Sequence, residues 1–284
     1  MSSVRSVEQV YKSIPTVEGA GVRLKRAFGF HQVPKLDPFL LLDDFHSARP
    51  ADYLPGFPWH PHRGIETVSY VLEGRVEHGD SMGNKGSIES GDVQWMTAGS
   101  GIVHQEMPHG TADGNLWGFQ LWTNLPASCK MMAPRYQEIQ QQDIPEVVFK
   151  GGIRVKLICG HLEGVQGPVR DIVTNPEYLD VRIPAKVSWK HEVAEGHTVF
   201  AYVIEGQGQF GSLAAAPLGV DHVVVFGSGD SVAVTAGARG VRFLLISGKP
   251  LGEPVAWAGP IVMNTEAELQ TAFEEYENGT FLGH

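Results

Sequence analysis

Apolar and polar residues alternate along most of the chain in short runs that are separated by Gly, Pro and Asp. The runs are rich in β-branched and aromatic residues, and only a few segments show helical periodicity. This pattern predicts an all-β fold of the sandwich or barrel type. The 34 glycines and 18 prolines fit the many tight turns that such a fold requires.

The clearest helical pattern is NTEAELQTAFEEYENGTF, near the C-terminal end. Asn264 or Thr265 can cap its first turn, apolar residues recur at helical spacing, and Asn278-Gly279 is a typical stop signal. We therefore expect one short C-terminal helix.

The chain contains an internal repeat. VSYVLEGRVEHGD at 68–80 resembles FAYVIEGQGQFGS at 200–212, and SGDVQWMTAG at 90–99 resembles SGDSVAVTAG at 228–237. In each copy the Glu-Gly pair is expected to form a turn that reverses a strand, because glycine tolerates positive φ. The repeat predicts two β-barrels or sandwiches in tandem.

The expected division places an N-terminal domain at 1–135 and a C-terminal domain, including the helix, at 136–284. SCKMMAPRYQEIQQQDIPEV at 128–147 interrupts the strand pattern and is interpreted as the connecting segment.

Charge and cysteine content narrow the function. A formal charge of -10 gives no reason to expect direct binding to nucleic acid or to an anionic membrane, since both require a basic surface. Cys129 and Cys159 are far apart in apolar settings, which argues against a disulfide framework and a thiolate metal site. The N-terminal stretch lacks the apolar core of a secretion signal. We expect a cytoplasmic protein, with the nucleus as a further compartment if the source is eukaryotic.

Two pairs of candidate metal ligands stand out. His60 and His62 flank Pro61, which favours an extended backbone, and His104 and Glu106 have the same spacing. Side chains at i and i+2 of a strand point to the same face, so each pair can converge on one ion. Three nitrogens and one oxygen suit iron, manganese, nickel or copper, whereas a structural zinc site is more often closed by cysteines. Glu66 is a fifth candidate, because it shares the face of His62 along an uninterrupted strand.

The repeat strengthens this interpretation, because a lone His-x-His is more often packed or hydrogen-bonded than a metal ligand. When the copies are aligned, the candidate ligands are absent from the second half: His60, His62, His104 and Glu106 fall opposite Glu192, Ala194, Arg242 and Leu244. This asymmetry is typical of an active domain joined to a structural one.

Several motifs together resemble one known family. They are LDPFLLLDDF at 36–45, HPHRGIETVSYVLEG at 60–74, GDVQWMTAGSGIVHQEMP at 91–108 and GPIVMN at 259–264. In their order and spacing they resemble the pirin branch of the bicupins and span nearly the whole chain. The resemblance implies two tandem cupin-type β-barrels.

The resemblance also implies that His60, His62, His104 and Glu106 bind the metal, and that Glu66 stands outside its coordination shell. The expected metal is one Fe(2+) per chain, with manganese, nickel, copper or zinc as alternatives. Pirins are described as quercetin 2,3-dioxygenases, which cleave flavonols with dioxygen and release carbon monoxide, or as non-catalytic iron-binding regulators of transcription or of metabolic enzymes.

For the enzyme, we expect a flavonol to approach the metal through its 3-hydroxyl group, with Glu106 as the catalytic base and Glu66 as the alternative base. For the regulator, an acidic chain would contact a protein partner rather than naked DNA. Phe57, Trp59 and Met96 are candidate pocket residues, although core packing is the more common role of such side chains.

Overall fold

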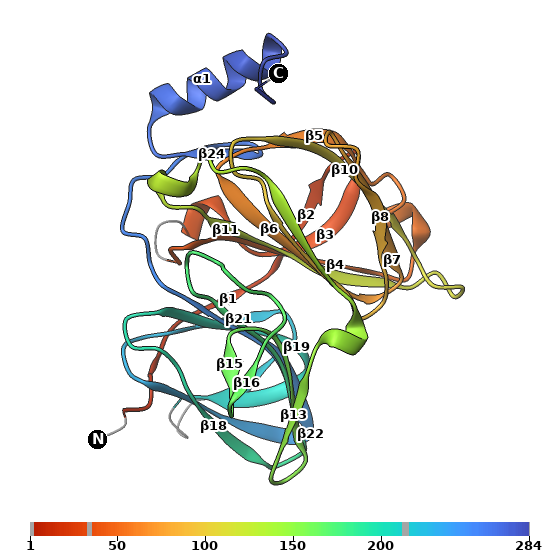
Figure 1. Cartoon of the computed structure of the whole chain (residues 1–284). Helices are drawn as coiled ribbons and strands as arrows, with labels where there is room; N and C mark the ends of the chain where they lie inside the picture. Colours follow the sequence, from red (N-terminus) through yellow and green to blue (C-terminus); the bar gives the residue numbers. More distant parts are fainter. Residues whose placement is uncertain (1–2, 33–35, 212–215, 284) are drawn as a thin grey trace. The chain divides into compact units, whose positions relative to one another are not determined.

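The computed structural model describes residues 3–32, 36–211 and 216–283 and consists mainly of β-strands (Figure 1). The chain divides into two compact units. We call residues Ile14–Gln141 with Leu251–His284 the N-terminal barrel, and residues Met1–Ser13 with Gln142–Pro250 the C-terminal barrel. The all-β prediction, with two barrels and a short C-terminal helix, is confirmed. Among the described residues, no helix is long and apolar enough to span a membrane.

The N-terminal barrel contains a seven-stranded sheet, in the order β12-β9-β6-β11-β4-β3-β2, and a four-stranded sheet, in the order β5-β10-β7-β8. Its strands are β2 (Ile14–Glu18), β3 (Val22–Phe28), β4 (Phe39–Ser47), β5 (Phe57–His62), β6 (Ile65–Glu73), β7 (Arg75–Asp80), β8 (Lys85–Ile88), β9 (Val93–Thr97), β10 (Ile102–His109), β11 (Leu116–Asn124) and β12 (Arg135–Ile139). Single 3-10 turns lie at Phe30–Gln32, Pro50–Asp52, Ala127–Cys129 and Gln141–Asp143.

The C-terminal barrel contains a nine-stranded sheet in which β1-β21-β19-β22-β17-β14-β13 is the main path, β18 pairs with β22 and β20 pairs with β19. Its strands are β1 (Val7–Lys12), β13 (Glu146–Phe149), β14 (Ile153–Cys159), β17 (Glu177–Ile183), β18 (Ser188–Glu192), β19 (Thr198–Phe210), β20 (Leu218–Gly219), β21 (His222–Phe226) and β22 (Ser231–Gly248), with a small hairpin of β15 (His161–Leu162) and β16 (Val165–Gln166).

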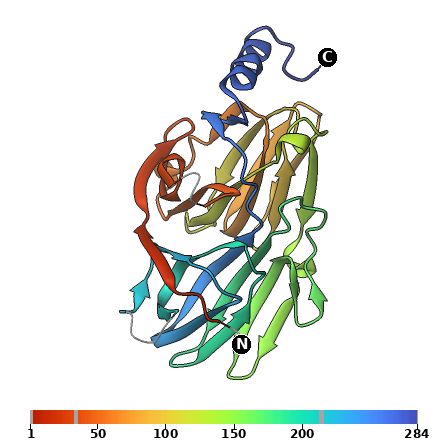
Figure 2. The same cartoon turned by 90° about the vertical axis from the view of Figure 1, so that its left-hand side faces the viewer.

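The two ends of the chain join the barrels differently from the sequential division at 135/136. β1 pairs antiparallel with β21 and so completes the C-terminal barrel, as its red strand beside the cyan and blue ones shows (Figure 2). The last 34 residues join the N-terminal barrel, and we call residues 251–284 the C-terminal strap. The expected connecting segment at 128–147 contains β12 and the first two residues of β13, which pair with β9 and β14 respectively.

The C-terminal strap consists of β23 (Ala256–Ala258), β24 (Ile261–Met263) and helix α1 (Glu266–Glu277). Its helix begins as predicted, with Thr265 as the N-cap in a capping box with Glu268, and ends at the C-cap Asn278. Ile261, Leu269 and other apolar residues of the strap form their own buried cluster, against which Val103 of β10 packs.

Arg63, 4% exposed, fastens the strap to the barrel. Its guanidinium donates to Ser100 O at 2.6 Å, to Phe281 O at 2.8 Å and to a Glu275 carboxylate oxygen at 2.6 Å, and lies 4.2 Å from the Phe281 ring centroid. A second cation reinforces this attachment.

The second cation is Lys130, which is 2% exposed. Its ammonium donates to Gly64 O, Asn124 Oδ1 and Val262 O at 2.7 to 2.9 Å. Three donors thus meet three acceptors, one of which belongs to the strap. Burial lowers the pKa of Lys130 to about 8.

The repeated Glu-Gly pair bends the chain instead of reversing it. Gly74 and Gly206 both have positive φ, 83° and 69°, as the repeat predicts. A Cβ at Gly206 would lie 2.2 Å from Gly240 O, and one at Gly74 would lie 2.5 Å from His109 O. However, the chain passes from β6 into β7 of the other sheet at Gly74, and β19 continues through Gly206. The prediction of a reversing turn is therefore wrong, because a glycine with positive φ also serves where the chain bends and continues.

Candidate metal centre

The three candidate histidines lie on two neighbouring strands. His60 and His62 occupy alternate positions of β5, and His104 of β10 is the cross-strand partner of His60. A register shift follows between His104 and Glu106, which brings Glu106 opposite Phe57. The i and i+2 spacing thus places the first pair on one face, and antiparallel pairing brings the third imidazole to it.

The imidazole rings converge through their Nε2 atoms. His60 Nε2 lies 3.1 Å from His62 Nε2 and 3.0 Å from His104 Nε2. Two ligands about 2.1 Å from one ion and at right angles to each other are about 3 Å apart, so these separations fit a single metal. The ligand atoms of all three residues lie within 4.8 Å of one another.

Two of the rings are held as the tautomer that a metal requires. His60 Nδ1–H donates to Pro58 O at 2.8 Å, and His62 Nδ1–H donates to Pro260 O at 3.1 Å. A carbonyl oxygen only accepts, so the proton must be on Nδ1 and the Nε2 lone pair is free. Pro260 belongs to the C-terminal strap, which therefore orients a candidate ligand.

Burial also keeps two of the imidazoles neutral. His62 and His104 are each 1% exposed. Burial, followed by the nearby His60, lowers the pKa of both rings well below the ordinary histidine value. A metal binds the unprotonated ring, so these sites are ready for a cation near neutral pH.

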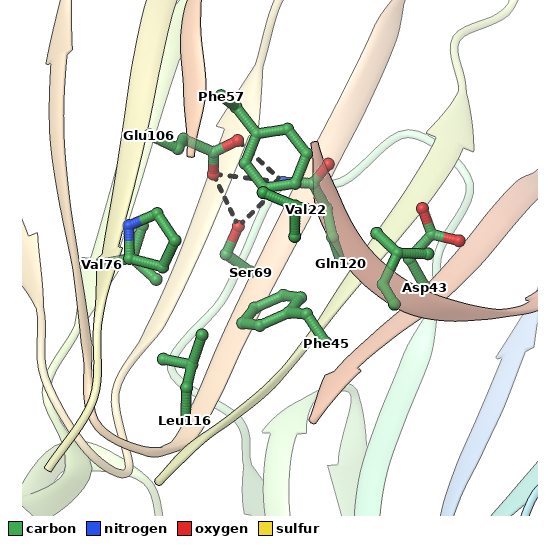
Figure 3. Close-up of a pocket in the computed structure, with 11 residues that line it drawn as sticks. Val22, Asp43, Phe45, Phe57, Ser69, Val76, Glu106, Leu116 and Gln120 are labelled. Atoms are coloured by element: carbon green, nitrogen blue, oxygen red, sulfur yellow. Dashed lines mark hydrogen bonds between the residues drawn. The ribbon is translucent and has the colours of Figure 1, made fainter. Parts of the chain in front are cut away.

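Glu106 lies beside His104. Neutral donors bind its carboxylate (Figure 3). Its Oε2 is 4.0 Å from His104 Nε2. Gln120 Nε2 donates to both carboxylate oxygens, at 3.1 and 3.0 Å, and Ser69 Oγ donates to Oε1 at 3.3 Å. Behind Glu106 is a small cavity of about 30 Å³ with Phe45, Leu116 and other apolar residues in its wall.

Glu66 lies apart from the histidine cluster. A break at Arg63-Gly64, where Gly64 has a φ of 78°, separates β5 from β6, so counting an uninterrupted strand from His62 fails. Glu66 Oε1 accepts a hydrogen bond from Thr97 Oγ1 at 2.7 Å. Burial raises its pKa, and the Thr97 hydrogen bond partly offsets that shift.

His60 and His62 line a cleft of about 690 Å³. His62 packs edge-on against Trp122, with ring centroids 5.0 Å apart, and Trp122 lies 6.1 Å from Trp257 of the strap. Phe57 and Trp59 also line the cleft, in agreement with the pocket interpretation, whereas Met96 is fully buried in a separate apolar cluster.

Sequence reasoning did not identify Ser69, Gln120 or Pro260 as parts of this region. Ser69 and Gln120 are polar residues with apolar neighbours on both sides, and that interruption is the signal that could have indicated them. Pro260 acts through its backbone carbonyl, which the sequence does not distinguish.

Comparisons with known proteins match the chain along nearly its full length. Residues 21–123 match the Pirin family, and residues 178–282 match the Pirin C-terminal cupin domain. The chain is 45% identical to a pirin-like protein of Caulobacter vibrioides (98% of this chain, 99% of that one) and 41% identical to pirin of Homo sapiens (98% and 94%). A crystal structure of quercetin 2,3-dioxygenase from Acinetobacter baumannii aligns with a TM-score of 0.89 at 31% identity, covering 98% of this chain and 99% of that chain.

Proposed function

The chain belongs to the pirin family of two-barrel cupins, and from this membership we propose that it is a metal-dependent dioxygenase that cleaves flavonols such as quercetin. The observation that carries the proposal is the convergence of three imidazole nitrogens, two of them from histidines that line an aromatic cleft. The similarity to a structure named quercetin 2,3-dioxygenase supports it. In this reaction the flavonol takes up both atoms of dioxygen, its central ring opens, and one ring carbon leaves as carbon monoxide.

We propose His60, His62, His104 and Glu106 as the ligands and Fe(2+) as the metal. Three imidazoles and one carboxylate suit a first-row divalent ion, and the same donors accept manganese, nickel, copper or zinc. A metal bound here would supply the Lewis acidity that lowers the pKa of a coordinated hydroxyl group.

Glu106 is the proposed acceptor of the proton from the flavonol 3-hydroxyl group. Its carboxylate lines the cleft, and the Gln120 amide contacts both of its oxygens. Gln120 and Ser69 are neutral donors, so they orient the carboxylate without forming an ion pair with it. As a ligand able to swing away from the metal, Glu106 would then accept the proton.

The cleft walls support the proposal of a flat aromatic substrate. Trp257 lies between Trp122, at 6.1 Å, and Phe30, at 5.4 Å between ring centroids. Rings of this kind stack on planar ligands, and 690 Å³ lies in the range of small-molecule sites. Arg26 and Asp43, joined by two hydrogen bonds of 2.8 and 2.7 Å, add a polar wall for phenolic hydroxyl groups.

The test is an aerobic quercetin assay on the full chain reconstituted separately with iron, manganese, nickel and copper. Turnover with carbon monoxide release is expected for at least one metal, with a loss of at least about 100-fold in His62→Ala and Glu106→Ala. Glu66→Gln is the matched control and should retain both metal and turnover. Absence of turnover with every metal, despite stoichiometric uptake, would overturn the dioxygenase and favour a metal-dependent binding protein.

A further inference from the structure

The C-terminal barrel has a hollow of its own, and arginines line it. The hollow measures about 520 Å³, and its walls include Arg154 of β14, Arg182 of β17, and Arg239 and Arg242 of β22. Glu205 is the one carboxylate among its lining residues. Such a concentration of positive charge is unexpected in a chain with a formal charge of -10.

Strand register places three of these arginines in one row. Arg154 is the cross-strand partner of Arg182, and Arg182 is the cross-strand partner of Arg242. Like charges directly opposite each other destabilise a sheet, so the row has an energetic cost when nothing balances it.

The fourth arginine projects from an interruption in β22. Gly206 pairs with Val241 and Gly208 with Ala236, so residues 237–240 bulge out of the ladder. Arg239 lies in this bulge and is exposed. Bulges of this kind often redirect a side chain towards a functional site.

The carboxylates nearby bind two of the four guanidiniums at hydrogen-bond distance. Arg242 is 8% exposed and donates to both carboxylate oxygens of Asp180, at 2.8 and 2.7 Å, and to Glu205 at 2.7 Å. Arg154 donates to Glu146.

The other two guanidiniums remain available. Arg182 is 53% exposed and lies 3.6 Å from the Glu205 carboxylate that Arg242 already binds. Arg239 has no hydrogen bond or ion pair within residues 3–32, 36–211 and 216–283. The hollow therefore has two guanidiniums for an external ligand.

We propose that this hollow is a binding site for a small organic polyanion, held through its phosphate or carboxylate groups by Arg182 and Arg239. A guanidinium presents a planar fork of donors that matches the oxygens of either group. The volume lies in the range of small-molecule sites, which favours a compact ligand over an acidic peptide. The site lies in the barrel without the histidine cluster, so the proposal is independent of the dioxygenase activity.

The test is isothermal titration of the metal-loaded full chain with tripolyphosphate and, separately, with citrate. One saturable site per chain is expected for at least one probe, and the preferred probe identifies phosphate or carboxylate as the recognised group. Arg182→Gln and Arg239→Gln should each weaken binding at least about tenfold, while Lys190→Gln, an exposed charge on β18, should change it less than twofold.

Three results would overturn the proposal. The first is no saturable binding of tripolyphosphate or citrate. The second is a loss of affinity in Lys190→Gln as large as in the two arginine variants. The third is binding of an oligoglutamate peptide but of neither small probe. A thermal-shift measurement guards against a merely structural effect. Without ligand, Arg182→Gln should melt no lower than the wild type, because the substitution relieves repulsion in the row, whereas the ligand-induced rise in Tm should be lost.

Discussion

Replacing Arg63 by Met should detach the C-terminal strap without unfolding the barrel. Met fills a similar volume but donates no hydrogen bond, so Ser100 O and Phe281 O lose the charged donor that binds them. Each buried acceptor left unpaired costs about 1–3 kcal/mol, whereas Glu275, at 37% exposure, regains water. The sum, about 2–6 kcal/mol, includes the range of about 3–5 kcal/mol typical of breaking one side of a buried pair.

Hydrogen exchange followed by mass spectrometry measures this loss locally. A decrease of about 3–4 kcal/mol corresponds to exchange about 100 to 1,000 times faster in the amides of α1 (Glu266–Glu277), with little change in the apolar strand β6. The strap supplies Pro260 O to His62, so metal affinity should fall about 10- to 100-fold in the same variant.

Arg75→Met is the matched control. Arg75 pairs with Glu77 at 3.1 Å, but both side chains are about half exposed, so its loss should cost less than about 1 kcal/mol. Wild-type exchange rates in α1 of Arg63→Met would refute the assignment of Arg63 as the anchor of the strap.

Three further predictions follow from buried polar groups. Gln120→Leu removes the amide that contacts both oxygens of Glu106. Metal affinity should fall about 10- to 100-fold, while the circular dichroism spectrum stays unchanged. A metal affinity equal to that of the wild type would contradict the orienting role of Gln120. Glu66→Gln keeps an acceptor for the Thr97 hydroxyl group. Burial raises the pKa of Glu66 in the folded state, so the wild type loses stability as pH rises through that pKa. In urea unfolding the variant should therefore be more stable than the wild type at pH 7, with no such gain below pH 4.5. Burial lowers the pKa of Lys130 from 10.5 to about 8. Between pH 8 and 10.5 the unfolded chain still binds the proton that the folded protein has lost, so the free energy of unfolding of the wild type should rise by about 3 kcal/mol as pH rises through this range. The same rise in Lys130→Met would exclude Lys130 as its source.

Local patterns in the sequence predicted the barrels and the histidine cluster well. Gly74 and Gly206 mark corners that occur in both halves, and the alternation of β5 places His60 and His62 on one face. Both signals depend on neighbouring residues. The capping box at Thr265 is equally local, and α1 begins where it was predicted to begin.

Long-range pairing was beyond the sequence. Nothing local in β1 distinguishes pairing with β21, some 200 residues away, from pairing with a nearer strand. The strap carries apolar residues that suit either barrel, and Arg63 and Lys130, which anchor it, look like ordinary surface cations in the sequence. Glu66 shows the same limit, because counting by twos fails where Gly64 breaks the strand.

Because β1 belongs to the C-terminal barrel and the strap to the N-terminal barrel, the order in which the chain is synthesised affects when each barrel can be completed. A ribosome makes the histidine pair of β5 about 200 residues before it makes Pro260, whose carbonyl fixes one of those rings. The first barrel to be translated must therefore wait for the last part of the chain, whereas β1, made first, has no partner strand until β21 emerges. Domains usually fold as they leave the ribosome, but here the orientation of His62 by Pro260 waits until the C-terminal strap has been synthesised. Contiguous fragments that end near residue 140 should express as barrels with incompletely oriented histidines.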